Sequence, residues 1–533
     1  MKTDCIPYGQ IRFFSSLMND YTSENPRLKD LYHRFPTVEN FKAQIEEKQS
    51  FFNEEKRRVL THALREQYGQ LPVNKAVTAN IEALADPHTF TVTTGHQLSL
   101  FTGPLYFLYK IISTINTTRQ LGKSYPEFRF VPVYWMATED HDFAEINHFH
   151  LHEKKVCWHS EQGGMTGNFD TQTLDVVYER FAQEIGLGKN ADYLKQLFKE
   201  SYLNHSDLAS ATRYLVNTLF EAHGLVVVDG KHAELKKEFI PYMKEDLARH
   251  TAHTEVTQSI QLLQQIDKNY PVQVNPRAIN LFYLTPNGRH RIVRQNDAYA
   301  VLDTDIRMSE TELHALLETS PERFSPNVIM RPLYQEVILP NLSYIGGGGE
   351  IAYWLELKQF FKSQQVPFPI LMLRNSVMLI NQKQYEKCQK MDLPVAQLFL
   401  SPTNLKNLKT KELSEFPIDF APQRTVLQQQ FADLYQLATK TDATFENAVK
   451  AQEKKQLKGL DMLEKRLLKA QKRKLSQQLQ RITDLQSELF PNGSLQERYS
   501  NFSEFYTQYG DALIATLIAA LNPFDFRFAV IEL

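Results

Sequence analysis

The chain has 533 residues, of which 42% are apolar and 23% charged, a composition typical of a folded protein with more than one structural unit. Its formal net charge is −2, so no global basic field exists to drive non-specific nucleic-acid binding. Cys5, Cys157 and Cys388 form no CxxC pair, which argues against a disulfide framework and a thiolate zinc site. The N-terminus lacks a signal-peptide core and no apolar run could span a bilayer, so a cytoplasmic protein is expected.

Strands and helices alternate from about residue 88, after a mainly helical N-terminal segment. TFTVTT (89–94) and RFVPVYWMA (129–137) have the composition of buried strands, and residues 105–122 between them have the apolar spacing of a helix. Further helices and strands are expected at 211–224, 224–230, 336–349, 351–364 and 367–380, in the order helix, strand, strand, helix, strand. Because strand–helix–strand units form parallel sheets covered by helices, the sequence predicts an α/β fold.

Two less regular stretches, about 151–205 and 250–325, are interpreted as insertions into the sheet domain, the second with a small hairpin at 290–302. The strands stop after residue 380. We therefore predict a catalytic core over 1–380, including the helical N-terminal segment, and a C-terminal helical domain over 381–533.

A long helix is predicted at about 441–489, a stretch without proline. Leu468, Leu475, Ile482 and Leu489 recur every seven residues, the spacing that keeps one seam facing a partner helix. A helix of this length would reach roughly 70 Å, beyond the width of a typical domain. It must therefore pack along another helix, such as residues 421–440, or protrude and dimerise.

The first candidate site is the loop between the first predicted strand and its helix. Its candidate binding residues are Gly95, His96, Gln97, Thr102, Gly103 and, on the helix, Lys110. The carboxyl ends of parallel strands are where open α/β sheets bind ligands, and backbone amides there can approach a phosphate or carboxylate. The alternative is that the glycines only shape a turn. The loop is not a Walker loop, because no GK[ST] follows.

The second candidate site follows the next strand, so it should lie at the same edge of the sheet. It consists of Glu139, Asp140, His141 and Asp142, with Asn147 beyond. An Asp–His pair could accept a proton from an attacking amine, and the alternative is a solvated acidic turn. Several histidines crowd between residues 141 and 159, but no HExxH helix is present. No metal ligands are therefore assigned and no structural zinc is expected.

The third candidate site surrounds four successive glycines between a predicted strand and a helix. Its residues are Arg331, Gln335, Gly347, Gly348, Gly349 and Glu350. Such a glycine run is costly in chain entropy, which suggests a backbone that passes close to a ligand, and Arg331 would suit a carboxylate or phosphate. The alternative is a flexible linker before a helix whose first turn carries Glu350.

Long ordered blocks extend over nearly the whole chain: TGHQLSLFTGPLYFLYKIIS, PVYWMATEDHDFAEINH, RPLYQEVILPNLSYIGGGGEIAYWLELK and QERYSNFSEFYTQYG. Together they resemble the bacillithiol synthase family of cysteine ligases. The resemblance implies a Rossmann-like parallel-sheet core, insertions like the connecting peptides of class I aminoacyl-tRNA synthetases, and a C-terminal α-helical coiled-coil domain that forms a homodimer. It also implies that cysteine is added to glucosaminyl malate in the last step of bacillithiol biosynthesis.

The resemblance further implies ATP or ADP, with magnesium on the phosphates. In the family a nucleotide site separate from the central cleft involves the C-terminal part, for which Arg498 and Asn501 are the candidates here. The expected partners are small-molecule substrates and a second copy of the chain, with no nucleic acid and no membrane.

The resulting hypothesis is amide-bond formation, in which an amine attacks a carboxylate of cysteine that a nucleotide has activated. The amine must lose a proton, and Asp140, His141 or Asp142 is the candidate base. Backbone amides of the glycine loops would hold oxygen atoms, and Arg331 and Lys110 would offset negative charge. The alternatives are a nucleotidyltransferase or adenylate-forming enzyme acting on another amine, or a coiled-coil scaffold whose α/β domain only binds ligands.

Overall fold

A computed structural model describes residues 3–69, 71, 73–286 and 288–533, and the chain divides into two compact units. The first unit combines Phe13–Leu379 with Ser494–Ile531 and the start of the chain up to Gly9, and the second is built on Ile380–Gly493. Residues 494–531, which the sequence assigns to the C-terminal helical domain, thus group with the first unit. The reason is long-range pairing that composition does not reveal, since β15 (Arg527–Glu532) pairs antiparallel with β1 (Thr3–Pro7).

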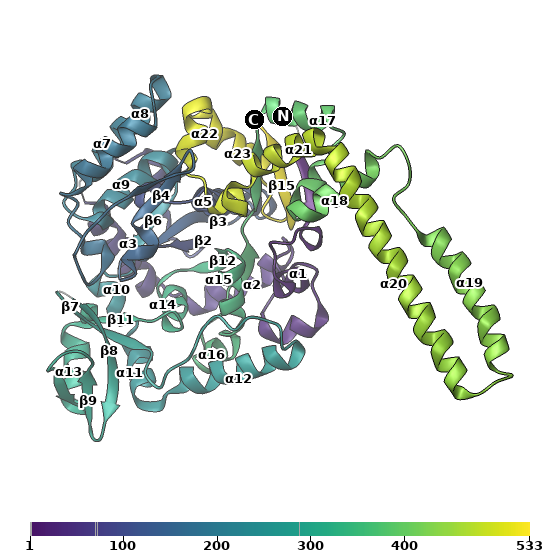
Figure 1. Ribbon diagram of the computed structural model, residues 1–533. Coiled ribbons are helices and arrows are strands. Elements are labelled where there is room, and N and C mark those ends of the chain that lie inside the picture. The colour runs from purple at the N-terminus through teal and green to yellow at the C-terminus, as the bar shows by residue number, and fades with distance from the viewer. Residues whose placement is uncertain (1–2, 70, 72, 287) are drawn as a thin grey trace. The chain divides into compact units, whose positions relative to one another are not determined.

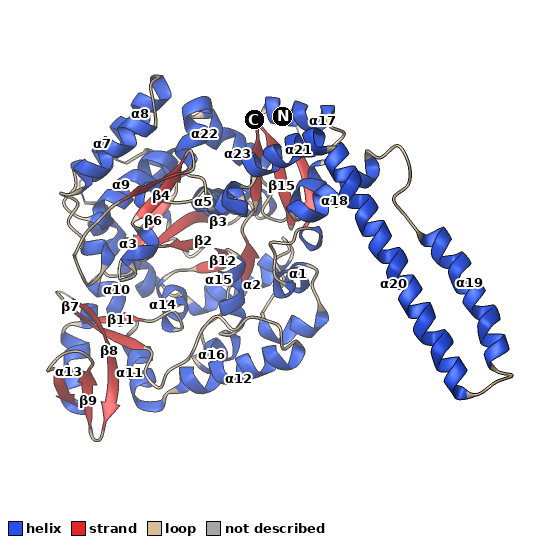
Figure 2. Cartoon of the chain, viewed as in Figure 1, coloured by secondary structure: helices blue, strands red, loops and turns tan. Residues whose placement is uncertain are grey.

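A five-stranded parallel sheet forms the centre of the first unit (Figure 2). Its strands are β2 (Thr89–His96), β3 (Arg129–Met136), β6 (Val226–Asp229), β12 (Asn341–Gly346) and β13 (Ile370–Leu373). They lie in the order β13-β12-β2-β3-β6, and every neighbouring pair is parallel. Counted along the chain this order is 3-2-1-4-5, that of a Rossmann fold. The predicted α/β class and its Rossmann-like core are therefore confirmed.

Helices cover this sheet and form much of the insertions around it (Figure 1). In the first unit they are α1 (Ser16–Thr22), α2 (Asn40–Phe51), α3 (Glu54–Tyr68), α4 (Lys75–Ala83), α5 (Tyr106–Ser124), α6 (Phe143–Ile146), α7 (Leu174–Glu184), α8 (Lys189–Phe198), α9 (Leu208–Phe220), α10 (Ala233–Lys237), α11 (Ile240–Arg249), α12 (Thr251–Ile266), α13 (Glu310–Thr319), α14 (Met330–Ile338), α15 (Gly348–Leu355), α16 (Lys358–Ser363), α22 (Phe502–Tyr509) and α23 (Ala512–Ala520). Within the described residues, every helix is too short or too polar to span a lipid bilayer.

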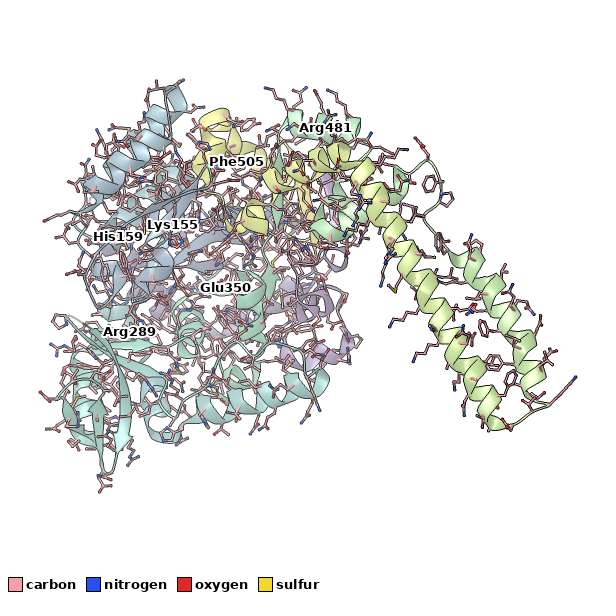
Figure 3. The ribbon with its side chains drawn as sticks, viewed as in Figure 1. Lys155, His159, Arg289, Glu350, Arg481 and Phe505 are labelled. Carbon is pink, nitrogen blue, oxygen red and sulfur yellow. The ribbon has the colours of Figure 1, made fainter. Side chains whose placement is uncertain are left out.

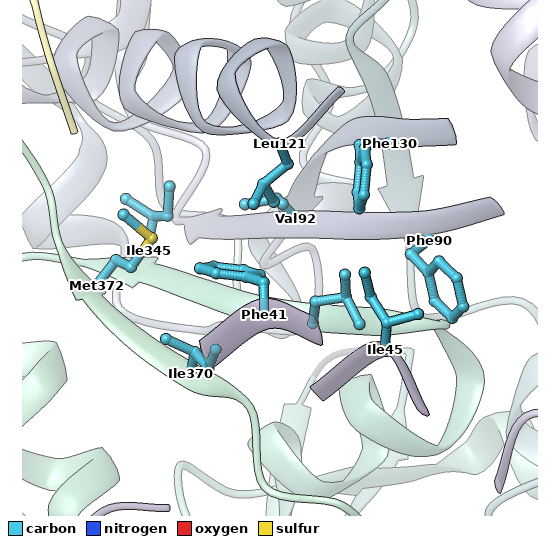
Figure 4. Packing of buried hydrophobic residues seen from close by; sticks show 10 residues of the cluster. Phe41, Ile45, Phe90, Val92, Leu121, Phe130, Ile345, Ile370 and Met372 are labelled. Carbon is cyan, nitrogen blue, oxygen red and sulfur yellow. The ribbon is translucent and has the colours of Figure 1, made fainter. Parts of the chain in front are cut away.

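The core of the sheet is a cluster of buried apolar side chains (Figure 4). Phe41 and Ile45 of α2 are four residues apart, so they share one face of their helix and pack against the strands. Phe90 and Val92 of β2 belong to the same cluster, as does Ile345 of β12. Burial of these side chains excludes water from the strands whose carboxyl ends form the site described below.

Two strands predicted from apolar runs differ from the structure. Residues 336–338, expected as part of a strand, end helix α14, and β12 begins only at Asn341. Every side chain from Met330 to Ile338 except that of Arg331 is buried, including the polar Gln335 and Glu336, so the helix has no solvent-exposed polar face of the kind that identifies a surface helix. The predicted strand 367–380 is divided into β13 and β14 (Val377–Ile380), which belong to different sheets.

The stretches interpreted as insertions lie between β3 and β6 and between β6 and β12. The first contains the hairpin of β4 (His148–Leu151) and β5 (Lys154–Cys157), followed by α7 and α8. The second contains a five-stranded antiparallel sheet, in the order β10-β9-β8-β7-β11. Its strands are β7 (Leu281–Thr285), β8 (Gly288–Gln295), β9 (Ala298–Val301), β10 (Arg307–Ser309) and β11 (Phe324–Pro326). Strands β8 and β9 confirm the predicted hairpin.

Glu356 anchors the segment that leads into this antiparallel sheet. Its buried carboxylate accepts hydrogen bonds from the backbone amides of Gln273 and Val274, at 2.8 and 3.4 Å. Burial outweighs these hydrogen bonds and raises the pKa of Glu356 to about 7. Between pH 4.5 and about 7, Glu356 therefore keeps its proton in the folded protein and has lost it in the unfolded chain.

The free energy of unfolding should consequently fall by about 3 kcal/mol between pH 4.5 and 7 because of this one group, at about 1.4 kcal/mol per pH unit. Glu356→Gln cannot titrate and should lack this fall. Urea denaturation of both proteins at pH 4.5, 5.5, 6.5 and 7.5 measures the difference between them. A difference that does not change with pH would contradict the prediction.

The second unit is helical, with α17 (Gln382–Lys390), α18 (Pro402–Glu412), α19 (Ala421–Ala438), α20 (Ala443–Lys474) and α21 (Ser476–Leu489). Arg424 near the start of α19 contacts Asp461 and Glu464, whereas Tyr435 near its end donates to Glu453. Helices α19 and α20 therefore pack antiparallel, which is the first of the two predicted alternatives. The prediction of a single helix over 441–489 is wrong. Helix α20 ends at Lys474, and Leu475, one of the residues of the seven-residue seam, separates it from α21.

Candidate active site

A cavity of about 460 Å³ opens at the carboxyl ends of β2, β3 and β12. The strand order reverses between β2 and β12, and this is the position at which open α/β sheets bind ligands. The predicted residues that line the cavity are Gly95, His96, Gln97, Lys110, Glu139, Asp140, Arg331 and Glu350. Residues from all three candidate sites therefore line one cavity.

Lys110 and Glu350 form an ion pair in the cavity wall. Lys110 Nζ lies 2.6 Å from Glu350 Oε2 and donates to the carbonyl oxygen of Gly95 at 2.5 Å. The same carboxylate accepts from the amide of Gly347 at 2.9 Å and from the hydroxyl of Tyr344 at 2.6 Å. Burial alone would raise the pKa of Glu350, but Lys110 outweighs it and lowers that pKa. The glycine run therefore serves as the capped start of α15, whose third helical residue is Glu350.

His96 is neutral and has a defined tautomer. Its Nδ1 lies 2.9 Å from the carbonyl oxygen of Gln97, which can only accept, so Nδ1 carries the proton and Nε2 is an acceptor. Burial, together with the nearby charge of Lys110, lowers the pKa of His96 to about 3. The ring stacks on Tyr106, with centroids 5.4 Å apart. His96 can thus accept a hydrogen bond from a ligand but does not bring positive charge to it.

An acidic wall forms around Gln97. The side-chain nitrogen Nε2 of Gln97 donates to Asp140 Oδ2 at 2.7 Å and to Glu145 Oε2 at 2.9 Å. Burial would raise the pKa of Asp140, but hydrogen bonds from His141 and Gln97 outweigh it and hold that pKa well below the usual range. Asp140 is therefore a permanent anion, suited to an ammonium or hydroxyl group and a weak proton acceptor.

His141 and Asp142 do not line the cavity, although they follow Asp140 directly. Both are exposed, and Asp142 precedes the short helix α6 without capping it through its side chain. His141 Nδ1 lies 3.4 Å from Arg289 Nη1, and Arg289 itself lines the cavity. His141 therefore stands beside the cavity rather than inside it.

The second insertion contributes to the cavity through Arg289 on β8. Figure 3 marks Arg289 on the antiparallel sheet and Glu350 near the parallel sheet. Arg289 donates to Ser325 Oγ at 3.1 Å, and Ser325 donates to Glu139 at 2.9 Å. Glu139 also pairs with the fully buried Lys236, at 2.7 Å. Glu139 thus joins the insertion to the end of β3, so its carboxylate is largely occupied by protein partners.

The remaining predicted residues lie outside the cavity. Thr102 and Gly103 shape a tight turn, since both have positive φ angles and a Cβ at Gly103 would lie 2.8 Å from that of Ser99. Asn501 donates to the carbonyl oxygens of Phe101 and Gly103 and so supports the same turn. The others are Asn147, on a separate surface hollow, the exposed Arg498, the buried Gln335, and Gly347, Gly348 and Gly349.

Sequence reasoning missed several polar residues of the cavity. Tyr344, Tyr353, Glu145, Lys231 and Arg289 all line it. Glu145 and Tyr353 each lie close in sequence to a candidate motif, and that proximity was the available signal. No local signal identifies Arg289, because the insertion that carries it is brought to the sheet only by folding. Among the described residues, no three His, Cys, Asp or Glu side chains are grouped to hold a metal ion.

The parallel sheet and its cavity define a Rossmann-like α/β protein with a polar cavity at the topological switch point. Two family models match the chain. "Bacillithiol biosynthesis BshC, N-terminal Rossmann-like domain" covers residues 1–375, and "Bacillithiol biosynthesis BshC, C-terminal coiled-coil domain" covers residues 377–533. The chain belongs to the BshC family of bacillithiol biosynthesis.

Similar proteins match over nearly their full lengths. A protein of Flavobacterium psychrophilum is 54% identical over 533 residues, covering 100% of both chains. One from Flavobacterium johnsoniae is 53% identical with the same coverage. One from Bacillus mycoides is 28% identical, covering 96% of this chain and 97% of its own. All three carry the name "Putative cysteine ligase BshC".

Proposed function

We propose that this protein is a ligase that joins the carboxyl group of cysteine to the amine of glucosaminyl malate, the last step of bacillithiol biosynthesis. The observation that carries the proposal is the division of charge in the cavity. Arg331 presents a guanidinium nitrogen, Nη2, that is buried without a hydrogen-bond acceptor, and Asp140 and Glu145 form an acidic wall. Such a cavity suits substrates that carry both carboxylate and ammonium groups. The names of the relatives support the same reaction class.

The amine of the acceptor substrate must be bound and then deprotonated. Asp140 and Glu145, held together by Gln97, would bind its ammonium form. Because the pKa of Asp140 is lowered, the proton would pass to His141 beside it, which is exposed to solvent. Neutral His96 would accept a hydrogen bond from a substrate hydroxyl or amine.

A nucleotide would supply the activation of the cysteine carboxylate. The guanidinium of Arg331 and the end of β2 at Gly95 and His96 suit an ATP or ADP phosphate as well as they suit a carboxylate, and magnesium would enter bound to the phosphates. We also propose a cytoplasmic homodimer formed through α19 and α20, since Val426, Met462 and Leu463 on these helices are more than half exposed. Neither nucleic acid nor membrane is proposed as a partner.

Replacing His141 and Asp142 together by alanine should lower ligation at least about 100-fold, the usual contribution of a general base. Both side chains are exposed, so the free energy of unfolding should change by less than about 1 kcal/mol. Mass spectrometry of the product formed from cysteine, glucosaminyl malate and ATP measures the rate. The exposed His159→Ala is the matched control and should remain active.

A fully active double variant would overturn the assignment of the base. The nucleotide product shows how the carboxylate is activated, and the acceptor amine separates the proposed ligase from its alternatives. Release of AMP with pyrophosphate indicates adenylation, whereas ADP indicates phosphorylation of the carboxylate. A product formed only with a different amine would favour another adenylate-forming enzyme.

A further inference from the structure

Arg331 is held at the cavity wall by a hydrogen bond to Gln335 and by an interaction with Tyr353. Its Nη1 donates to Gln335 Oε1 at 3.0 Å, one helical turn further along α14. The guanidinium carbon lies 5.8 Å from the ring centroid of Trp135 and 5.7 Å from that of Tyr344. Nη2 is buried without a hydrogen-bond partner among the described residues. A buried guanidinium nitrogen without an acceptor is costly unless a ligand supplies one.

Gln335 is in turn fixed by a buried ion pair. Its Nε2 donates to Glu336 Oε1 at 2.9 Å, so its Oε1 must face Arg331. Lys48 of α2 lies 3.1 Å from Glu336 Oε2, and neither of these two side chains is exposed to solvent. Asn341 at the start of β12 also donates to Glu336 Oε1, at 2.6 Å. The pair joins positions 288 residues apart, so it exists only in the folded chain.

The network leaves the charge of Arg331 uncompensated, because its one carboxylate is paired with Lys48. Lys48 neutralises Glu336, and an uncharged amide separates that carboxylate from the guanidinium. Gln335 therefore orients Arg331 without neutralising it, and the nearby carboxylate of Glu350 is already paired with Lys110, so the charge of Arg331 remains available for a ligand. A carboxylate at position 335 would orient the guanidinium of Arg331 equally well, but it would form an ion pair with Arg331 and neutralise its charge.

We propose that Lys48, Glu336 and Gln335 form a buried relay that positions Arg331 to bind a carboxylate or phosphate group of the ligand. The inference rests on the proposed function only for the location of the substrate in this cavity. Lys48, Glu336 and Gln335 are positioning residues, because none of them lines the cavity itself.

Calorimetric titration of the full chain with malate and, separately, with inorganic phosphate tests the relay. Gln335→Met removes the hydrogen bond to Arg331 at nearly constant volume and should raise the dissociation constant about tenfold for whichever anion binds. Malate binding identifies the group as a carboxylate, and phosphate binding identifies it as a phosphate. The matched control is Gln44→Met on α2, which removes a buried hydrogen bond to the carbonyl oxygen of Phe368 and should leave anion affinity unchanged.

The charge balance is tested at Lys48. Lys48→Met leaves Glu336 without its counter-ion and should weaken anion binding about tenfold or prevent folding, in which case Gln335→Met decides. The double variant Lys48→Met with Glu336→Gln restores neutrality and keeps an acceptor for Gln335, so its affinity should return to within about threefold of the wild type.

Unchanged affinity in Gln335→Met would overturn the relay, and so would a wild-type protein that binds neither anion. A wild-type protein that binds malate or phosphate through the relay but forms no product would overturn the proposed reaction alone. The two failures are therefore distinguishable.

Discussion

Glu497→Ala should lower the free energy of unfolding of the first unit by about 3–5 kcal/mol, because it leaves a buried arginine without its counter-ion. Glu497 accepts from Arg374 Nη1 and Nη2 at 3.0 and 2.8 Å, and the two side chains are 1% and 3% exposed. The carboxylate also accepts from the amide of Val377 at 2.9 Å. This pair attaches the C-terminal segment to the end of β13.

Tryptophan fluorescence during urea denaturation measures this loss, since Trp135, Trp158 and Trp354 all lie in the first unit. The control is Asp525→Ala, which breaks a more exposed ion pair with Arg527 in the same segment. It should have a much smaller effect than Glu497→Ala, because an exposed ion pair contributes little to stability. Equal effects of the two substitutions would contradict the structural role given to Glu497.

Lys110→Met is expected to destabilise the protein by about 3 kcal/mol and to abolish ligation. Methionine fills the space of the lysine stem but leaves Glu350 without its ion pair, with the hydrogen bonds from Tyr344 and the amide of Gly347 remaining. The lost charge also lies in the wall of the cavity. Urea denaturation gives the first effect, and product formation from cysteine and glucosaminyl malate gives the second.

The double variant Lys110→Met with Glu350→Gln separates stability from function. It removes both charges, so most of the lost stability should return while ligation stays absent. Lys123→Met, an exposed lysine on the same helix, should change neither quantity. Recovery of activity together with stability in the double variant would show that the pair is only structural.

Part of the candidate site was predictable because of how parallel sheets are built. Gly95 lies near the end of β2 and Glu139 lies shortly after the end of β3; both strands belong to one strand–helix–strand unit and end at the same edge. This rule of sheet construction correctly places both segments at one cavity. It could not separate Asp140, which faces the cavity, from the adjacent exposed His141, because the turn after β3 has no fixed period.

The sequence by itself determined the α/β class, the parallel order of the first strands and the presence of a long helical arm. These follow from local apolar periodicity and from glycine and proline positions, which act over a few residues. Only the tertiary structure decided that residues 336–338 are helical, that Arg289 reaches the cavity from an insertion and that Lys48 neutralises Glu336. Each of these depends on burial and charge pairing between residues far apart in the chain, and no local pattern contains that information.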